Sequence, residues 1–155
     1  MPKTSSSGPA PGRLVLFDLN AQRFGFRIDN LIEIGTVGAA RSASDLPGYI
    51  SGIALSRGRE VPILDLRALL GFSARPLSPS TPLIVMRVGA QAIGLAVDTV
   101  SNIHTPVGAW HPFPKGAVPE DLNPYTAVTR IEDDLLLVLD EQMLLSVARA
   151  EKEAA

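Results

Sequence analysis

The residues best suited to chemistry are few in this chain and lie far apart in the sequence. Its 155 residues include two histidines and no cysteine, which excludes disulfides, thiolate metal sites and a cysteine nucleophile. His104 and His111 lie at or beside a proline-rich stretch, and no Gly-x-Ser-x-Gly motif accompanies them. We interpret both as ordinary loop residues and expect no catalytic residue, cofactor or metal site.

Carboxylates recur at four matching positions, which are Asp29, Asp98, Asp65 and Asp140. Paired carboxylates can serve as general acid and base. Each of these, however, follows a predicted strand, where aspartate caps a turn or a helix by accepting backbone N–H bonds. We therefore interpret all four as caps. The run Glu132-Asp133-Asp134 lacks the spacing of a calcium loop and is interpreted as a solvated hairpin tip.

Two further features leave alternatives open. Arg57-Gly58-Arg59 forms a predicted hairpin tip, and the planar fork of arginine binds carboxylates bidentately, so this tip is either a partner contact or a solvated turn. Trp110, the only tryptophan, either fills a seam of the fold or anchors a partner. The Pro-x-x-Pro pattern at 76–79 is interpreted as a linker rather than a peptide ligand.

The elements that carry these residues repeat along the chain. Residues 14–34 and 83–103 align without a gap, with Gly25 on Gly94 and Asp29 on Asp98. Such a self-match implies one supersecondary unit built twice. The second halves of the two units, 61–70 and 136–145, match at a larger offset, so the second unit contains an insertion. We assign this insertion to residues 104–124.

Composition and strand pattern favour a globular all-β protein. Apolar residues make up 46% of the chain and charged residues 19%, and the net charge of −2 argues against nucleic acid or an anionic membrane surface as a partner. No apolar run approaches the ~20 residues of a membrane helix. Short strands with little helix predict two five-stranded barrels packed side by side, with short helical turns and a C-terminal helix to about Ala150. We expect the protein to be cytoplasmic.

The repeat also predicts the domain boundaries. We expect a disordered lead at 1–12, one domain at 13–147 and a tail at 148–155. Within the domain the first barrel is expected at about 14–72, a linker at 73–82 and the second barrel at about 83–147, with exchange of strands between the barrels left open. Units of roughly 60 residues are marginal alone, so we expect them to share a core or to pack tightly.

Three segments of the chain are similar to those of a known family. They read FGFRIDNLIEI at 24–34, YISGIALSRGREVPILDLRALLG at 49–71 and IGLAVDTVSNI at 93–103. The second is the most specific, because it is similar to the signature Ile-x-Gly-Val-x-Asn-Leu-Arg-Gly-x-x-Val-Pro-Val-x-Asp-Leu-Arg. Together with LLLVLDEQMLL at 135–145, these segments resemble the CheW family, the adaptors of bacterial chemosensory arrays, over about residues 14–145.

The resemblance implies two SH3-like barrels and an adaptor without catalysis. Such adaptors bind the regulatory domain of a CheA-type histidine kinase and the cytoplasmic tip of a methyl-accepting chemoreceptor, so the resemblance implies recruitment to membrane-associated or polar receptor arrays. It implies no direct membrane insertion. Carried over by position, the residues on or near the contact surfaces are Leu31, Glu33, Gly52, Arg57 and Gly58.

The chain departs from the family pattern at two places. Leu55-Ser56 replaces the usual Asn-Leu before Arg-Gly, and Ala127 replaces a glycine in the last hairpin. Loss of the asparagine removes a polar contact, so an adaptor of a secondary chemosensory or surface-motility pathway, or one that binds a non-kinase partner, is the alternative. A small-molecule-binding barrel or a hydrolase is the third hypothesis.

Overall fold

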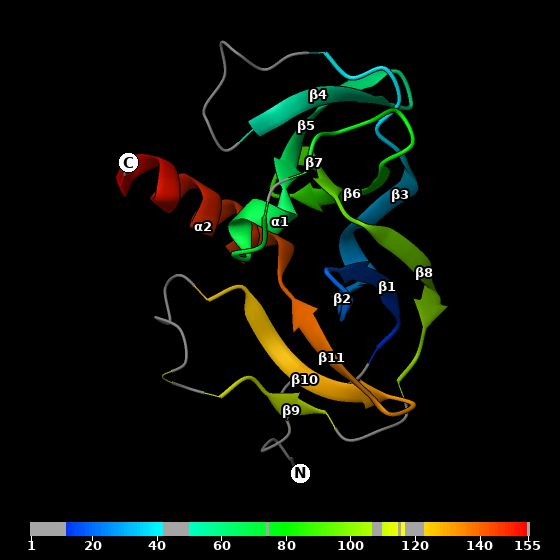
Figure 1. Cartoon of the computed structure of the whole chain (residues 1–155), viewed down its shortest axis with the longest axis vertical. Coiled ribbons are helices and arrows are strands. Elements are labelled where there is room, and N and C mark those ends of the chain that lie inside the picture. Colours follow the sequence, from blue (N-terminus) through cyan, green and yellow to red (C-terminus); the bar gives the residue numbers. More distant parts are fainter. Residues whose placement is uncertain are drawn as a thin grey trace.

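The structure, a computed structural model, describes residues 12–41, 50–73, 75–106, 110–114, 116 and 123–154. Its strands form two sheets, with one short helix between them and a longer helix at the C-terminal end (Figure 1). The prediction of an all-β fold with a C-terminal helix is confirmed. The disordered lead predicted at 1–12 lies, apart from Gly12, outside the described residues.

Sheet A has six strands in the order β8-β1-β2-β11-β10-β9. They span Leu14–Leu19 (β1), Gln22–Arg27 (β2), Thr99–His104 (β8), His111–Pro112 (β9), Tyr125–Ile131 (β10) and Asp134–Leu139 (β11). Neighbouring strands are antiparallel, except that β2 and β11 are parallel. The sheet has one strand more than predicted, because two residues of the insertion pair with β10 as β9.

Sheet B has five strands in the order β3-β6-β7-β5-β4. They span Leu31–Thr36 (β3), Ile50–Ser56 (β4), Arg59–Asp65 (β5), Pro82–Val88 (β6) and Gln91–Ala96 (β7). Here the parallel pair is β5 and β7. Both sheets therefore share one plan, in which two hairpins meet through a parallel pair. A further strand adds to one hairpin in sheet B and to each hairpin in sheet A.

The two sheets do not coincide with the two sequence repeats. The chain places β1 and β2 in sheet A, builds sheet B from β3 to β7, and returns to sheet A at β8. The linker at 73–82 thus separates the repeats but lies within sheet B, between β5 and β6. Sheet A combines the β1–β2 hairpin of the first repeat with strands of the second, and sheet B combines the β6–β7 hairpin of the second repeat with strands of the first. Hairpins are thus exchanged between the repeats, a possibility that the sequence left open.

Tight turns fix the register of the hairpins. Asn20-Ala21 closes β1–β2 and Arg57-Gly58 closes β4–β5, and all four residues have positive φ. Two consecutive residues with positive φ form the type I′ turn, whose twist matches that of the flanking strands. Two more hairpins, β6–β7 and β10–β11, also have two-residue loops. Register is therefore set locally, although the pairing between hairpins is not.

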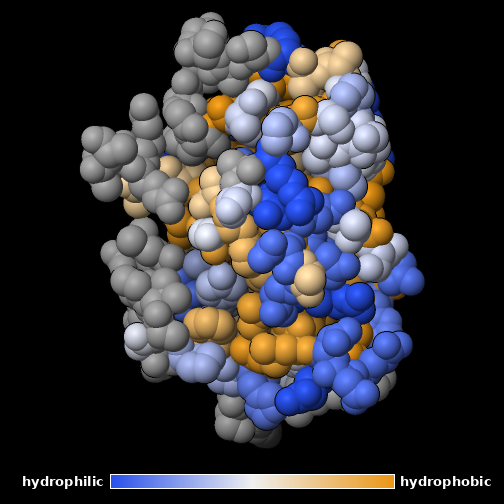
Figure 2. All heavy atoms as spheres, in the orientation of Figure 1, coloured by the Kyte–Doolittle hydropathy of each residue, from blue (hydrophilic) through white to orange (hydrophobic). Residues whose placement is uncertain are grey.

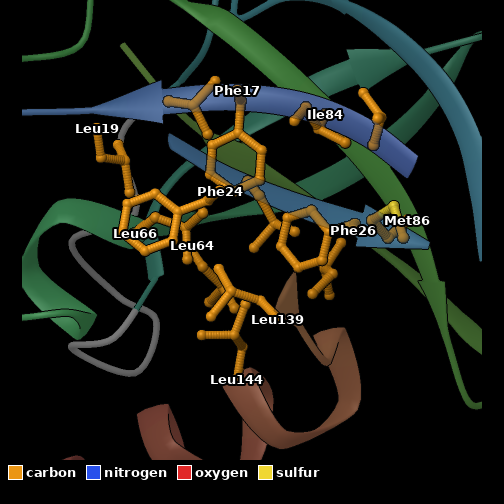
Figure 3. Close-up of a cluster of buried hydrophobic side chains, with 14 of the residues drawn as sticks. Phe17, Leu19, Phe24, Phe26, Leu64, Leu66, Ile84, Met86, Leu139 and Leu144 are labelled. Atoms are coloured by element: carbon orange, nitrogen blue, oxygen red, sulfur yellow. The ribbon is translucent and has the colours of Figure 1, made fainter. Parts of the chain in front are cut away.

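A shared core joins the sheets, as predicted from the small size of each unit. Figure 3 shows side chains from both sheets, from the short helix and from the C-terminal helix meeting in one cluster. Phe17 of β1 stacks on Phe24 and Phe26 of β2, with ring centroids 5.7 and 5.1 Å apart. Ile84 of β6 and Leu144 are fully buried in the same cluster. Neither sheet can lose this contact without exposing apolar surface to water.

Each sheet also has an apolar interior of its own. Leu14 and Leu16 contribute to the interior of sheet A, and their repeat partners Leu83 and Val85 contribute to that of sheet B. Trp110 belongs to the sheet A interior and is 3% exposed. This burial fits the interpretation that the tryptophan fills a seam of the fold, and the alternative of a partner anchor stays a prediction.

Both helices begin at aspartates, as the cap interpretation of Asp65 and Asp140 predicted. The Asp65 carboxylate accepts from the Ala68 N–H at 3.4 Å to start α1 (Leu66–Leu69), and Asp140 accepts from the Gln142 N–H at 2.8 Å to start α2 (Glu141–Ala154). α2 extends four residues past the predicted end, because ARAEKEA at 148–154 contains only good helix formers. No helix in the described part of the chain is long and apolar enough to cross a membrane.

Candidate protein-binding surface

Three of the five residues carried over from the family gather at one place. Glu33 lies on β3, while Arg57 and Gly58 form the turn between β4 and β5. These strands, β3 and β4, stand at opposite ends of the strand order of sheet B. The surface formed by residues 31–34 and 55–59, here called the seam surface, is therefore where the two edges of sheet B approach each other.

Side chains rather than a backbone ladder connect the two edges there. The Ser56 hydroxyl, which is buried, donates a short hydrogen bond to the Glu33 carboxylate. The Arg57 guanidinium donates to the carbonyl oxygen of Ile32 at 3.3 Å. A hydrogen bond to a charged carboxylate is stronger than one between neutral groups, and half-burial of Glu33 protects it from water. Two hydrogen bonds thus join β3 to the β4–β5 hairpin, one from Ser56 to Glu33 and one from Arg57 to Ile32.

The backbone of Arg57 is held in an unfavourable conformation. Its φ of 53° lies in the left-handed region, which costs a residue with a side chain about 1–2 kcal/mol. Glycine or asparagine would occupy this turn position at lower cost. Strain of this kind at an exposed position motivates a functional hypothesis. The exposed guanidinium, set on a rigid type I′ turn, is the best candidate for a partner contact on this surface.

Gly52 and Leu31 have structural explanations instead. A Cβ on Gly52 would lie 3.3 Å from the carbonyl oxygen of Arg41, which pairs with Ile53 beside it. Glycine is needed there for close backbone approach. Leu31 is half-buried, pairs with Met86 and packs against the shared core. Gly52 lies outside the seam surface, whereas Leu31 lies within it but packs its side chain against the core, and the contact role of both stays a prediction.

A groove beside the seam surface is bordered by arginines. It has a volume of about 800 Å³, and its lining includes Arg57, Arg59 and Arg87. The acidic residue in the lining, Glu60, binds Arg41 through two hydrogen bonds of 3.1 and 3.2 Å, which together with the charge of Arg41 lower the pKa of its carboxyl. Because the negative charge of Glu60 is balanced by Arg41, the other arginines give the groove a positive rim.

Exposed large apolar side chains lie on the strands around these edges. Leu55 of β4 is 68% exposed, Ile34 of β3 41% and Ile103 of β8 39%. Ile34 and Ile103 occupy equivalent positions of the repeat, and β3 and β8 lie on the same side of the molecule in Figure 1, away from α2. Figure 2 shows apolar atoms reaching the surface between hydrophilic ones on the face viewed there. Apolar side chains exposed on edge strands are suited to partner contact.

The two histidines lie on the edge strands of sheet A. His104 ends β8, His111 begins β9, and both are exposed. Among the described residues, no group of three or more histidine, cysteine, aspartate or glutamate side chains is arranged to hold a metal ion.

One buried cluster was missed by the sequence analysis. Asp98, interpreted as a turn cap, instead pairs with Arg67 through an Nη1–Oδ2 contact of 2.6 Å. The same carboxylate oxygen accepts from the backbone N–H of Asn20 at 2.8 Å. Asp29 lies inside a 3₁₀ turn, Ile28–Asn30, whose N-cap position is Arg27, and its Oδ1 lies 3.7 Å from the Nε of Arg27. Identical residues at equivalent positions thus have different partners, because those partners come from outside the repeated segment.

Comparison with known proteins gives a consistent result. The family model of the CheW-like domain matches residues 13–149. The chain is 27% identical to the chemotaxis protein CheW of Klebsiella aerogenes over 85% of its own length and 80% of that protein. It is 30% identical to the protein FrzA of Myxococcus xanthus, over 64% of this chain and 63% of FrzA. The crystal structure of the scaffolding protein TtCheW from Thermoanaerobacter tengcongensis superposes with a TM-score of 0.73 at 22% identity, covering 87% of this chain and 92% of that one.

Proposed function

This chain belongs to the CheW-like domain family, and from that premise we propose that it is a non-catalytic adaptor coupling a CheA-type histidine kinase to chemoreceptors in a bacterial chemosensory array. Membership rests on the family match over residues 13–149. The seam surface, where Glu33 and Arg57 join the edges of sheet B beside a groove with a positive rim, is the observation that carries the proposal. An adaptor of this kind works in the cytoplasm, next to the receptor array.

The seam surface supports the kinase contact. Arg57 projects from a rigid turn, and its guanidinium has donors beyond the one bond to Ile32. A preorganised arginine loses little conformational entropy when it binds a carboxylate. The regulatory domain of the kinase is proposed to contact this turn.

The exposed edge strands support the receptor contact. Ile34 and Ile103 present apolar side chains from β3 and β8, one from each sheet. A receptor tip is a helical hairpin, and an amphipathic helix binds through apolar side chains spaced along one face. The surface that carries these two isoleucines is the proposed position of that helix.

A charge reversal tests the kinase contact. We expect Arg57→Glu to weaken binding to the regulatory domain of the CheA-type kinase from the same organism by about tenfold or more, since a guanidinium that faces a carboxylate becomes a repelling charge. Isothermal titration calorimetry measures the change. Arg130→Glu is the matched control, because Arg130 is exposed on β10 of sheet A. If Arg57→Glu binds as tightly as the control, Arg57 is not in the interface.

One observation favours the alternative of a secondary pathway. Leu55 stands where the family signature has asparagine, and it is 68% exposed beside Arg57. An apolar side chain at the contact favours a different partner surface from that of a housekeeping adaptor. Capture of binding partners from the cells of origin, comparing wild type with Leu55→Asn, tests this. Recovery of the same kinase in the same amount with both proteins would rule out a role for Leu55 in partner choice.

A further inference from the structure

Two hairpin tips at equivalent positions of the repeat have opposite charge. The β4–β5 tip reads Arg57-Gly58-Arg59, and the β10–β11 tip reads Glu132-Asp133-Asp134. Both tips are two-residue loops whose first residue has a φ of 53°, but the second residue has positive φ only in the basic tip, at Gly58, so the two turns differ in type. The repeat therefore places a basic tip on sheet B and an acidic tip at the equivalent position of sheet A.

The basic tip borders the groove of about 800 Å³ beside the seam surface. Arg59 and Arg87 line this groove together with Arg57, and all three are exposed. In the part of the chain that the structure describes, neither Arg59 nor Arg87 has an ion pair with a carboxylate. Because Glu60 is already bound by Arg41, the groove lacks an acidic counterpart of its own.

The floor of the groove is apolar. Val61 and Val85 are buried side chains of the sheet B interior that reach this lining, and Ala92 packs against them. A segment that fits must therefore carry carboxylates for the rim and an apolar side chain for the floor.

The acidic tip has both properties. Residues 132–134 are exposed, and no ion pair within the described residues neutralises them. The next residue, Leu135, is 44% exposed, which is unusual for a leucine in a strand whose other face is buried. Its carbonyl is bound by the Gln22 side-chain amide, which fixes the strand at this point.

We propose that the acidic β10–β11 tip of one copy of this chain docks in the arginine-rimmed groove of a second copy. The two tips cannot meet within one molecule, because they lie toward opposite ends of its long axis (Figure 1). The contact joins two different surfaces of the chain, so it either closes reciprocally in a dimer or continues from copy to copy. Being formed by exposed charges, it is weakened by salt.

Charge swapping at the two surfaces tests the contact with the purified chain alone. We expect wild type to associate reversibly at low ionic strength in sedimentation velocity, and Arg59→Glu/Arg87→Glu or Glu132→Lys/Asp133→Lys to lower the association constant at least tenfold. Arg57 is left unchanged, so the kinase contact is not altered directly. Arg149→Glu, on α2 and outside both hairpins, should associate as wild type does.

Mixing the two charge-swapped variants supplies the decisive result. In the mixture each groove meets a tip of opposite charge, so association should return, with one copy of each variant in the complex. Circular dichroism verifies that each variant is folded, and if one pair of substitutions prevents folding, the other pair still tests the contact. Wild type that stays monomeric at millimolar concentration in low salt, or association that both variants leave unchanged, would overturn the proposal without bearing on kinase binding.

Discussion

The chain crosses between its sheets twice, and the two crossovers are built differently. Where β7 leads into β8, Asp98 is bound by Arg67 from α1 and by the Asn20 backbone. Where β2 leads into β3, the equivalent Asp29 is exposed. There the link to the neighbouring helix is a hydrogen bond of 2.8 Å from the Asn30 side-chain amide to Glu141 of α2.

The difference shows that a repeated backbone does not need repeated chemistry. The Arg67–Asp98 crossover relies on a buried ion pair, whose side chains are 8% and 16% exposed. The Asn30–Glu141 crossover relies on an amide and a carboxyl that is largely removed from water. At the Arg67–Asp98 crossover, losing one partner leaves the other as an unpaired buried charge. At the Asn30–Glu141 crossover, the only ionisable group of the pair is a carboxyl that burial can shift in pKa.

The largest expected effect concerns the charged crossover. Arg67→Met leaves the Asp98 carboxylate without its main partner and should lower the free energy of unfolding by about 3 kcal/mol. Asn30→Ala at the other crossover removes one hydrogen bond and should cost about 1 kcal/mol. Urea denaturation measures both. The double variant Arg67→Met/Asp98→Asn should lose less than Arg67→Met alone, because no unpaired charge is left. Equal losses at the two crossovers would contradict this comparison.

The second largest effect concerns the glycines in the strands before the two crossovers, where substitution by alanine should change stability to different extents. A Cβ on Gly94 would lie 3.0 Å from a methyl of Leu83, whereas on Gly25 the nearest atoms, in Leu14 and Leu16, are 3.4 Å away. Gly94→Ala should therefore destabilise by about 1–3 kcal/mol through overpacking. Gly25→Ala should be close to neutral, because contact at that distance is ordinary and alanine reduces the entropy of the unfolded chain. Thermal unfolding distinguishes them, and a Gly25→Ala loss as large as that of Gly94→Ala would contradict the difference.

The smallest effect is a pH dependence at the second crossover. Burial raises the pKa of Glu141 above 4.5, against the opposing effect of its bond to Asn30. Above about pH 4.5 the unfolded chain releases the Glu141 proton while the folded protein still holds it. The contribution of Glu141 to stability therefore falls as the pH rises from about 4.5. Glu141→Gln should remove this decline and be slightly more stable than wild type near neutral pH. Denaturation curves at several pH values measure it, and parallel profiles for both proteins would contradict it.

Local features of the fold were predictable from the sequence. Hairpins and caps depend on neighbouring residues, so Arg57-Gly58 and the aspartates Asp65 and Asp140 could be identified from their flanking patterns. The shared core followed from the small size of each repeat. In contrast, the parallel pairs β2–β11 and β5–β7 join segments far apart in the chain and leave no local signal.

The candidate surface was predictable only in part. Glu33 and Arg57 were identified by position, but their joint role in linking β3 to β4 depends on Ser56, at a place where the chain departs from the family. The Arg67–Asp98 pair was missed because an aspartate after a strand is well explained by capping. Trp110 could be placed only by tertiary packing, since a lone tryptophan in a proline-rich insertion has no periodicity to follow.

The exchange of hairpins between the two repeats has a consequence for folding during synthesis. β2 leaves the ribosome well before its parallel neighbour β11, because Gln22 and Leu135, which touch across that pair, are 113 residues apart. Sheet A therefore stays open until β11 has been made, and the β1–β2 hairpin must avoid aggregation in the meantime. A break between β5 and β6 would give two pieces, each lacking strands of both sheets. Such pieces should be unfolded alone and regain structure only by fragment complementation.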